Sequence, residues 1–412
     1  MVPSLGSLAV APDQSLLALS FVTAGVALGT VSGLTPGLHA NNFALLLAAV
    51  APSVPGPRRY VGAAMLAAGV VHTFLDVVPA LALGVPDPAM AASALPGHRL
   101  VLRGQGREAL RLSALGSALA VAFAVPLALP VTAAMERAYP VIRGHLSLVL
   151  GSVAVLLVLT ERSRWSRVGA ALALAGSGAL GMVALDLPAD GLLPAGEMLA
   201  PLFAGLFGAP VLVEALGGEG VPPQAEATVT TSRRFVASVA LVGTLAGAVV
   251  GYLPGISSAI AATGALVVLP ARGPRPFLVA TSGVNTANTI FALFALVALG
   301  NPRTGVLVAL ENAGVPVVLP LLLASVAIAA GAGFVLVIAL GDRYLAAVGS
   351  ADNTRLSVGV LGVLGVLVVA IAGLLGLLVF AVRTLVGLVP GRYGAKRANL
   401  MGVLLVPLAL GA

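Results

Sequence analysis

The chain has 412 residues, of which 59% are hydrophobic and only 9% charged. Soluble domains carry roughly 25% charged residues, so this composition excludes a soluble protein and predicts an all-α polytopic protein of the cytoplasmic membrane. The net charge of +7 comes almost wholly from arginines in short loops, which indicates positive-inside topology and contact with membrane lipid rather than nucleic-acid binding.

The first half contains six apolar segments close to the 20 residues or so that cross a bilayer. They are 15–51, which is broken at Pro36-Gly37, and then 61–84, 110–129, 141–159, 168–185 and 192–216. The polar stretch 217–231 follows. We interpret it as a linker between a first transmembrane repeat, 1–216, and a second, 232–412.

The second half repeats this opening. Its segments are 235–269, which is broken at Pro254-Gly255, and then 277–299, 315–340, 356–389 and a last one from residue 400. In total we expect about ten to twelve membrane segments. Counting crossings places Arg392, Lys396 and Arg397 on the opposite side of the membrane from the other basic loops, against the positive-inside rule. Either the segment 356–389 contains an extra crossing or the count is wrong.

One motif, G-x-x-x-G-x-x-P-G, occurs at 29–37 and again at 247–255. Proline removes a backbone donor and glycine tolerates non-helical dihedrals, so each copy predicts a broken, re-entrant hairpin, at 15–51 and 235–269. Paired breaks at matching places in two halves indicate a transporter's substrate site. Because an odd number of crossings separates them, we expect the repeats to be inverted.

A half-helix that begins at membrane depth exposes unpaired N–H groups and a positive dipole end, which favour an anion. A kinked helix whose polar side chains satisfy the freed backbone is the alternative. The candidate substrate-binding residues are Ser32, Thr35, Pro36, Gly37, His39, Asn41 and Asn42 at the first break, and Pro254, Gly255, Ser257 and Ser258 at the second.

Polar and ionisable residues also fall inside two unbroken spans. An ionisable group in a span is costly and is a functional candidate by default. The candidates for a coupling-ion site or a cavity wall are His72, Asp76, Asn285, Asn288 and Thr289. The alternatives are a neutral histidine satisfied by the carboxylate, and hydrogen bonds between helices. An offset of 216 places His72 opposite Asn288 and Thr73 opposite Thr289.

Four segments carry a family resemblance: 34–47, 251–269, 201–210 (PLFAGLFGAP) and 397–407 (RANLMGVLLVP). In this order they resemble the TctA family, the large membrane subunits of tripartite tricarboxylate transporters. The length and His39-Ala40-Asn41-Asn42 are more similar to its archaeal branch. The resemblance implies secondary, ion-coupled uptake of citrate-like carboxylates, with a small membrane subunit and an extracytoplasmic binding protein as partners.

The sequence therefore predicts a permease for a small organic anion, a di- or tricarboxylate, coupled to Na⁺ or H⁺. It contains no H-E-x-x-H, P-loop or G-x-S-x-G motif, so we expect no metal, no other cofactor and no enzymatic activity. Two alternatives stay open. Polyprenyl-phosphate translocases are similar in their paired Pro-Gly hairpins, and an intramembrane enzyme would use Asp76 and His72 as acid and base.

Overall fold

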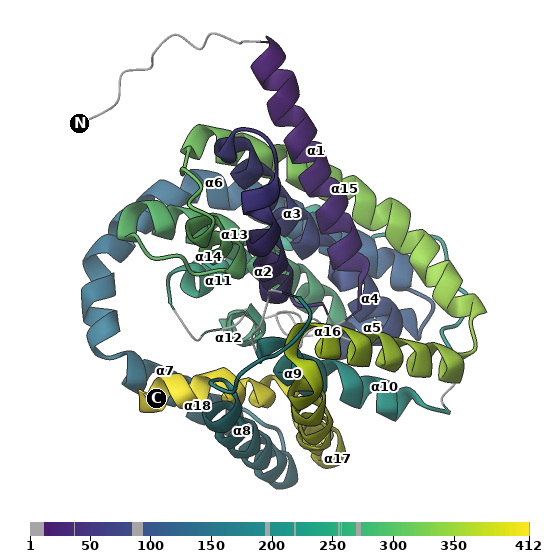
Figure 1. The fold of residues 1–412 in the computed structure, drawn as a ribbon. Helices are drawn as coiled ribbons and strands as arrows, with labels where there is room; N and C mark the ends of the chain where they lie inside the picture. Colours follow the sequence, from purple (N-terminus) through teal and green to yellow (C-terminus); the bar gives the residue numbers. More distant parts are fainter. Residues whose placement is uncertain are drawn as a thin grey trace.

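The computed structural model describes residues 12–36, 38–84, 94–193, 198–217, 220–253, 256, 258–268 and 273–411. Within these ranges the regular structure is helical throughout (Figure 1). The helices of the first half are α1 (Pro12–Leu34), α2 (Ala40–Val50), α3 (Arg58–Leu75), α4 (Val77–Leu83), α5 (Ala94–Val101), α6 (Gly106–Gly144), α7 (Leu146–Leu159), α8 (Arg164–Ala184), α9 (Leu199–Phe203) and α10 (Ala209–Ala215).

The second half contributes α11 (Arg233–Tyr252), α12 (Ser258–Val268), α13 (Pro274–Leu299), α14 (Gly305–Asn312), α15 (Leu319–Ser350), α16 (Asn353–Gly387), α17 (Val389–Tyr393) and α18 (Gly402–Leu410). Over the described residues, eight helical segments are long and apolar enough to cross a membrane, and four shorter apolar segments accompany them. The prediction of a polytopic helical membrane protein is confirmed.

The long helix α6 differs from its prediction. The expected span 110–129 extends to Gly144, because the helix continues through Pro126, Pro130 and Pro140. The expected span 141–159 is correspondingly shortened to α7. Prolines are tolerated inside membrane helices and bend them, and α6 curves around one side of the molecule to reach α7 (Figure 1).

The apolar run 356–389 is interrupted at its middle. Gly373 has φ 66° and ψ −163° inside α16, so the helix is broken there. The loop after α8 covers the break, where the Leu193 N–H donates to the Ala370 carbonyl at 2.8 Å. The break divides the run into two helical parts. The side of the membrane on which the C-terminal segments lie stays a prediction.

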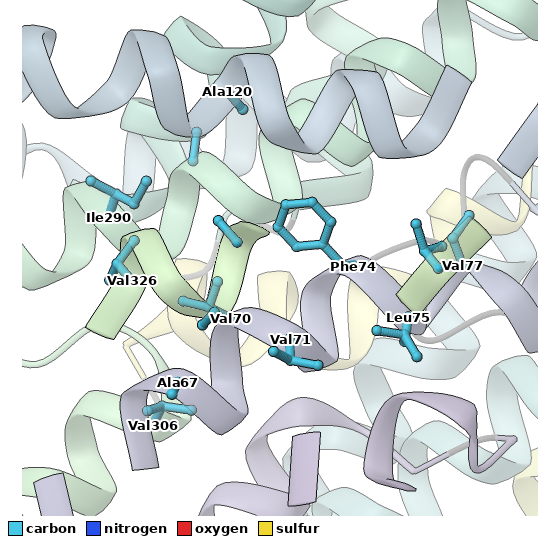
Figure 2. Packing of buried hydrophobic residues seen from close by; sticks show 14 of the residues in the cluster. Ala67, Val70, Val71, Phe74, Leu75, Val77, Ala120, Ile290, Val306 and Val326 are labelled. Carbon is cyan, nitrogen blue, oxygen red and sulfur yellow. The ribbon is translucent and has the colours of Figure 1, made fainter. Parts of the chain in front are cut away.

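Helix α3 lies in the largest of the three apolar cores among the described residues. Figure 2 shows Val70 and Phe74 of α3 among side chains from neighbouring helices, including Val326 of α15 and Val306 of α14. The apolar window of the span Arg58–Leu83 is completely buried. The second core gathers α7, α8, α9, α12, α16 and α18 around Phe207 and Leu202.

Three glycines let α1 approach α3 to backbone contact. A Cβ added at Gly25 would lie 2.2 Å from the Ala64 carbonyl oxygen, and one at Gly29 would lie 2.3 Å from that of Ala68. At Gly33 it would lie 2.8 Å from Leu75 Cβ. Small residues four apart are a standard device for close packing of membrane helices. We call this contact the first glycine seam.

The second glycine seam joins α11 to α13 with the same spacing. A Cβ at Gly243 would lie 2.7 Å from the Ala280 carbonyl oxygen, one at Gly247 would lie 2.8 Å from Ala287 Cβ, and one at Gly251 would lie 2.8 Å from Phe291 Cβ. The G-x-x-x-G part of the repeated motif thus packs helices.

The seams show how the broken segments run. Contacts advance together along α1 and α3, and along α11 and α13, so each pair is parallel. Two helices of one chain can lie side by side and run in the same direction only if the segment between them leads the chain back to the end at which the first helix began. The intervening α2 and α12, 11 residues each, therefore lie on returning arms. The re-entrant depth of these arms, the inverted relation of the two repeats and their domain boundaries stay predictions.

Substituting a seam glycine should loosen the fold. Gly29→Ala and Gly247→Ala each place a methyl group against a backbone carbonyl or a packed side chain, and we expect a loss of about 1–3 kcal/mol from overpacking. The measurement is the melting temperature of the detergent-purified protein. Gly362→Ala in α16 is the control, because no atom lies within 4 Å of its added Cβ. Equal melting temperatures for all three variants would contradict the seam.

Candidate anion-binding cavity

A cavity of about 200 Å³ lies where the two hairpins meet α3, α13 and α14. Its wall is made by His39, Ala40, Asn41, Gly69, Thr73, Phe203, Val250, Leu253, Ile256, Ser258, Asn285, Asn288, Thr289, Arg303, Thr304, Gly305, Val306, Met401 and Leu404. We call it the central cavity. Residues from both halves of the chain line it.

The central cavity sits near half-depth of the spans. Gly69 and Thr73 are close to the middle of the span Arg58–Leu83, and Asn285 and Thr289 are close to the middle of Pro274–Leu299. The offset of 216 that aligns the two halves relates Gly69 to Asn285 and Thr73 to Thr289. Equivalent positions of the two halves thus face one cavity.

Three helix N-termini open onto this cavity. Ala40 and Asn41 begin α2, Ser258 begins α12, and Gly305 begins α14. The first N–H groups of a helix have no partner within the helix, and its dipole is positive at that end. Three such ends around one space create a positive potential without any charged side chain.

Side-chain contacts fix the position of these ends. His39 precedes α2, and its Nδ1 accepts a hydrogen bond from the Asn41 N–H at 2.9 Å. Its ring stacks on Phe203 with the centroids 4.9 Å apart. The Asn41 carboxamide oxygen accepts the Gly305 N–H at 3.2 Å, which ties the start of α2 to the start of α14.

Arg303 is the cationic side chain among the lining residues. Its Nη2 donates to the Tyr139 hydroxyl, and its guanidinium carbon lies 5.2 Å from the centre of the Tyr139 ring. Arg303 Nε, Asn288 Oδ1 and Thr304 Oγ1 are buried without a hydrogen-bond partner among the described residues. Buried polar groups are normally paired, so these three atoms suit a polar ligand.

A buried polar network extends outward from the cavity wall. The Asn285 carboxamide donates to Asp76 Oδ2 at 2.7 Å, and Asp76 is 4% exposed. The Thr73 and Thr286 hydroxyls lie 3.3 Å apart, and Thr286 donates to Ser117 at 2.9 Å. The lining residue Asn285 therefore connects the cavity to a buried carboxylate.

Six candidates from the sequence line the cavity, namely His39, Asn41, Ser258, Asn285, Asn288 and Thr289. Six others do not: Ser32, Thr35, Pro36, Asn42, His72 and Asp76. Ser32 Oγ lies 2.9 Å from His72 Nδ1, and the Thr35 hydroxyl donates back to the Val31 carbonyl. Gly37, Pro254, Gly255 and Ser257 lie outside the described residues.

Arg303 was missed by sequence reasoning, although a signal was present. Asn301-Pro302 follows the span 277–299. The arginine directly after that Pro is a cation at the end of a span, next to an apolar stretch too short to cross the membrane.

The fold and the cavity define a polytopic helical membrane protein with a positively polarised site at mid-depth. Residues 19–402 match the model of the tripartite tricarboxylate transporter TctA family. The chain belongs to that family, and the resemblance seen in the sequence is confirmed. It is a transporter family whose members are membrane components of tripartite systems.

An uncharacterised protein of Methanocaldococcus jannaschii is 29% identical over 300 residues, which are 72% of this chain and 73% of that protein. This archaeal relative is consistent with the likeness to the archaeal branch. No solved structure matches the chain.

Replacing the cavity's arginine should weaken anion binding. We expect Arg303→Gln to raise the dissociation constant for a carboxylate ligand at least about tenfold, since a charge-assisted hydrogen bond is lost. Isothermal titration with citrate checks this. The control is Arg143→Gln, an exposed arginine at the end of α6. An unchanged constant in Arg303→Gln would exclude the arginine from the site.

Proposed function

We propose that this protein is a secondary active permease that moves a small organic anion, a di- or tricarboxylate, across the cytoplasmic membrane. The observation that carries the proposal is the convergence of three helix N-termini and Arg303 on one mid-depth cavity. The family supports a carboxylate as the anion. A small membrane subunit and an extracytoplasmic binding protein are proposed as partners on the same ground.

The size of the cavity favours a small solute. Pockets for drug-sized ligands measure about 300–1,000 Å³, and the central cavity is about 200 Å³. Asparagine, threonine and arginine groups of the wall can each bind carboxylate oxygens. In transport, the two halves rock about the bound anion and expose it alternately to either side.

A polyprenyl-phosphate translocase is the second candidate, because a helix N-terminus that binds carboxylate also binds phosphate. Its substrate would need a path for the polyprenyl chain from the cavity into lipid. The enzyme alternative is weaker. It needs His72 and Asp76 to reach a substrate, and both are buried and do not line the cavity.

Uptake into proteoliposomes tests the proposal. We expect labelled citrate or another di- or tricarboxylate to accumulate when a Na⁺ or a pH gradient is imposed, and unlabelled carboxylates to compete. Arg303→Gln liposomes are the matched control. Failure of every carboxylate, with binding of polyprenyl phosphate instead, would overturn the proposal in favour of the translocase.

Asp76 is our candidate for coupling. The Asp76 carboxylate accepts a hydrogen bond from Asn285, which lines the cavity, while Asp76 itself does not line it. We expect Asp76→Asn to retain citrate binding within about threefold while abolishing gradient-driven accumulation. Binding by titration and uptake in liposomes, measured on the same preparation, separate the two steps. Accumulation at the wild-type level would remove Asp76 from coupling.

A further inference from the structure

A second hollow lies between α1, α2 and α3, apart from the central cavity. It measures about 290 Å³ and is lined almost wholly by apolar side chains, among them Phe21, Ala24 and Leu28 of α1, Leu47 and Val50 of α2, and Ala64 of α3. Its polar lining residue is Ser20, whose hydroxyl is already bonded to the Leu17 carbonyl at 2.7 Å. We call it the α1–α2 groove.

The groove lies along one side of α2. At its start α2 is tied to α14 through Asn41 and Gly305. Farther along, Leu47 and Val50 line the groove, and Leu47 also packs at the edge of the larger core. Val50 is 58% exposed and Leu28 is 48% exposed. In a bilayer, an apolar space open to the surroundings is filled by hydrocarbon.

The dimensions favour one acyl chain over a helix from another protein. The lining positions on α1 run from Ser20 to Leu28, a distance of about 12 Å at 1.5 Å per residue. A transmembrane helix packs along a seam of up to about 30 Å. The groove is therefore long enough for part of a fatty chain and too short for a helix seam.

A positive charge lies next to the groove. Arg59 is exposed at the start of the span Arg58–Leu83, where lipid head groups lie. Its guanidinium carbon is 4.9 Å from the centre of the Tyr60 ring, and that ring is 6.1 Å from the ring of Phe21, which lines the groove. Arg58 points elsewhere, because its Nη1 donates to the Ala313 carbonyl at 3.1 Å.

We propose that the α1–α2 groove is a binding site for an anionic phospholipid, with one acyl chain in the groove and the phosphate at Arg59. The polar partners of Arg59 are Gln14 Oε1 at 3.4 Å and the Tyr60 hydroxyl at 3.3 Å, both neutral, so its charge is available to a phosphate. This site does not depend on what the central cavity transports.

The experiment measures melting temperature in detergent with added dioleoyl-phosphatidylglycerol or dioleoyl-phosphatidylcholine, which share their chains and differ in charge. For the wild type we expect the anionic lipid to raise the temperature by at least about 3 °C more than the zwitterionic lipid. Arg59→Gln should lose this excess. Arg164→Gln, an exposed arginine at the start of α8, should keep it.

A second variant tests the chain-binding part. Ala24→Phe places a ring in the groove, so we expect it to reduce the shift with both lipids while citrate binding at the central cavity persists. Equal shifts for the two lipids in the wild type, or a retained excess in Arg59→Gln, would overturn the proposal. The absence of any lipid shift in the wild type would overturn it too and would make a protein partner the occupant to seek.

Discussion

The two glycine seams are the contacts on which the remaining architecture depends. Because Gly29 and Gly247 have no side chain, α1 and α11 can lie against the backbones of α3 and α13. This approach fixes each pair as parallel, and parallel neighbours require the chain between them to return toward the side from which it came. The hairpins are therefore a consequence of helix packing as much as of proline.

The central cavity follows from where the returning arms begin. Each arm starts at half-depth, so the unpaired N–H groups of α2 and α12 face the protein interior rather than the head groups. In hydrocarbon such groups would be costly, and they must be satisfied by side chains, water or a ligand. His39 Nδ1 accepts one N–H at the start of α2, and the Asn41 carboxamide accepts one at the start of α14. Arg303 adds a full positive charge to the same space.

Local chemistry explains which features were predictable from the sequence. The breaks near Pro36 and Pro254 follow from proline and glycine alone, and His39, Asn41 and Ser258 reach the cavity because they directly follow those breaks. Asn285 and Thr289 were recognisable as polar residues within a span. By contrast, Phe203 and Met401 line the cavity only because distant segments pack there, and no local pattern encodes such packing.

Other features of the structure were not predicted from the sequence, because one residue pattern can serve two physical roles. The prolines of α6 suggested helix ends, whereas they bend a helix that continues for 39 residues. The G-x-x-x-G spacing was read together with Pro-Gly as a single break motif, although its glycines make helix contacts. Arg303 was not predicted as a site residue because the helix that follows it, α14, has only eight residues and is too short to be recognised as a membrane span.

The bond between Asn285 and Asp76 has a consequence for how the chain is made. These partners are 209 residues apart, and ribosomes add about 5–20 residues per second, so Asp76 enters the bilayer roughly 10 to 40 seconds before Asn285 exists. During that interval a carboxylate resides in a span destined for complete burial. The first half must therefore shelter Asp76 by itself, or with the insertion machinery, until the second half arrives to close around it.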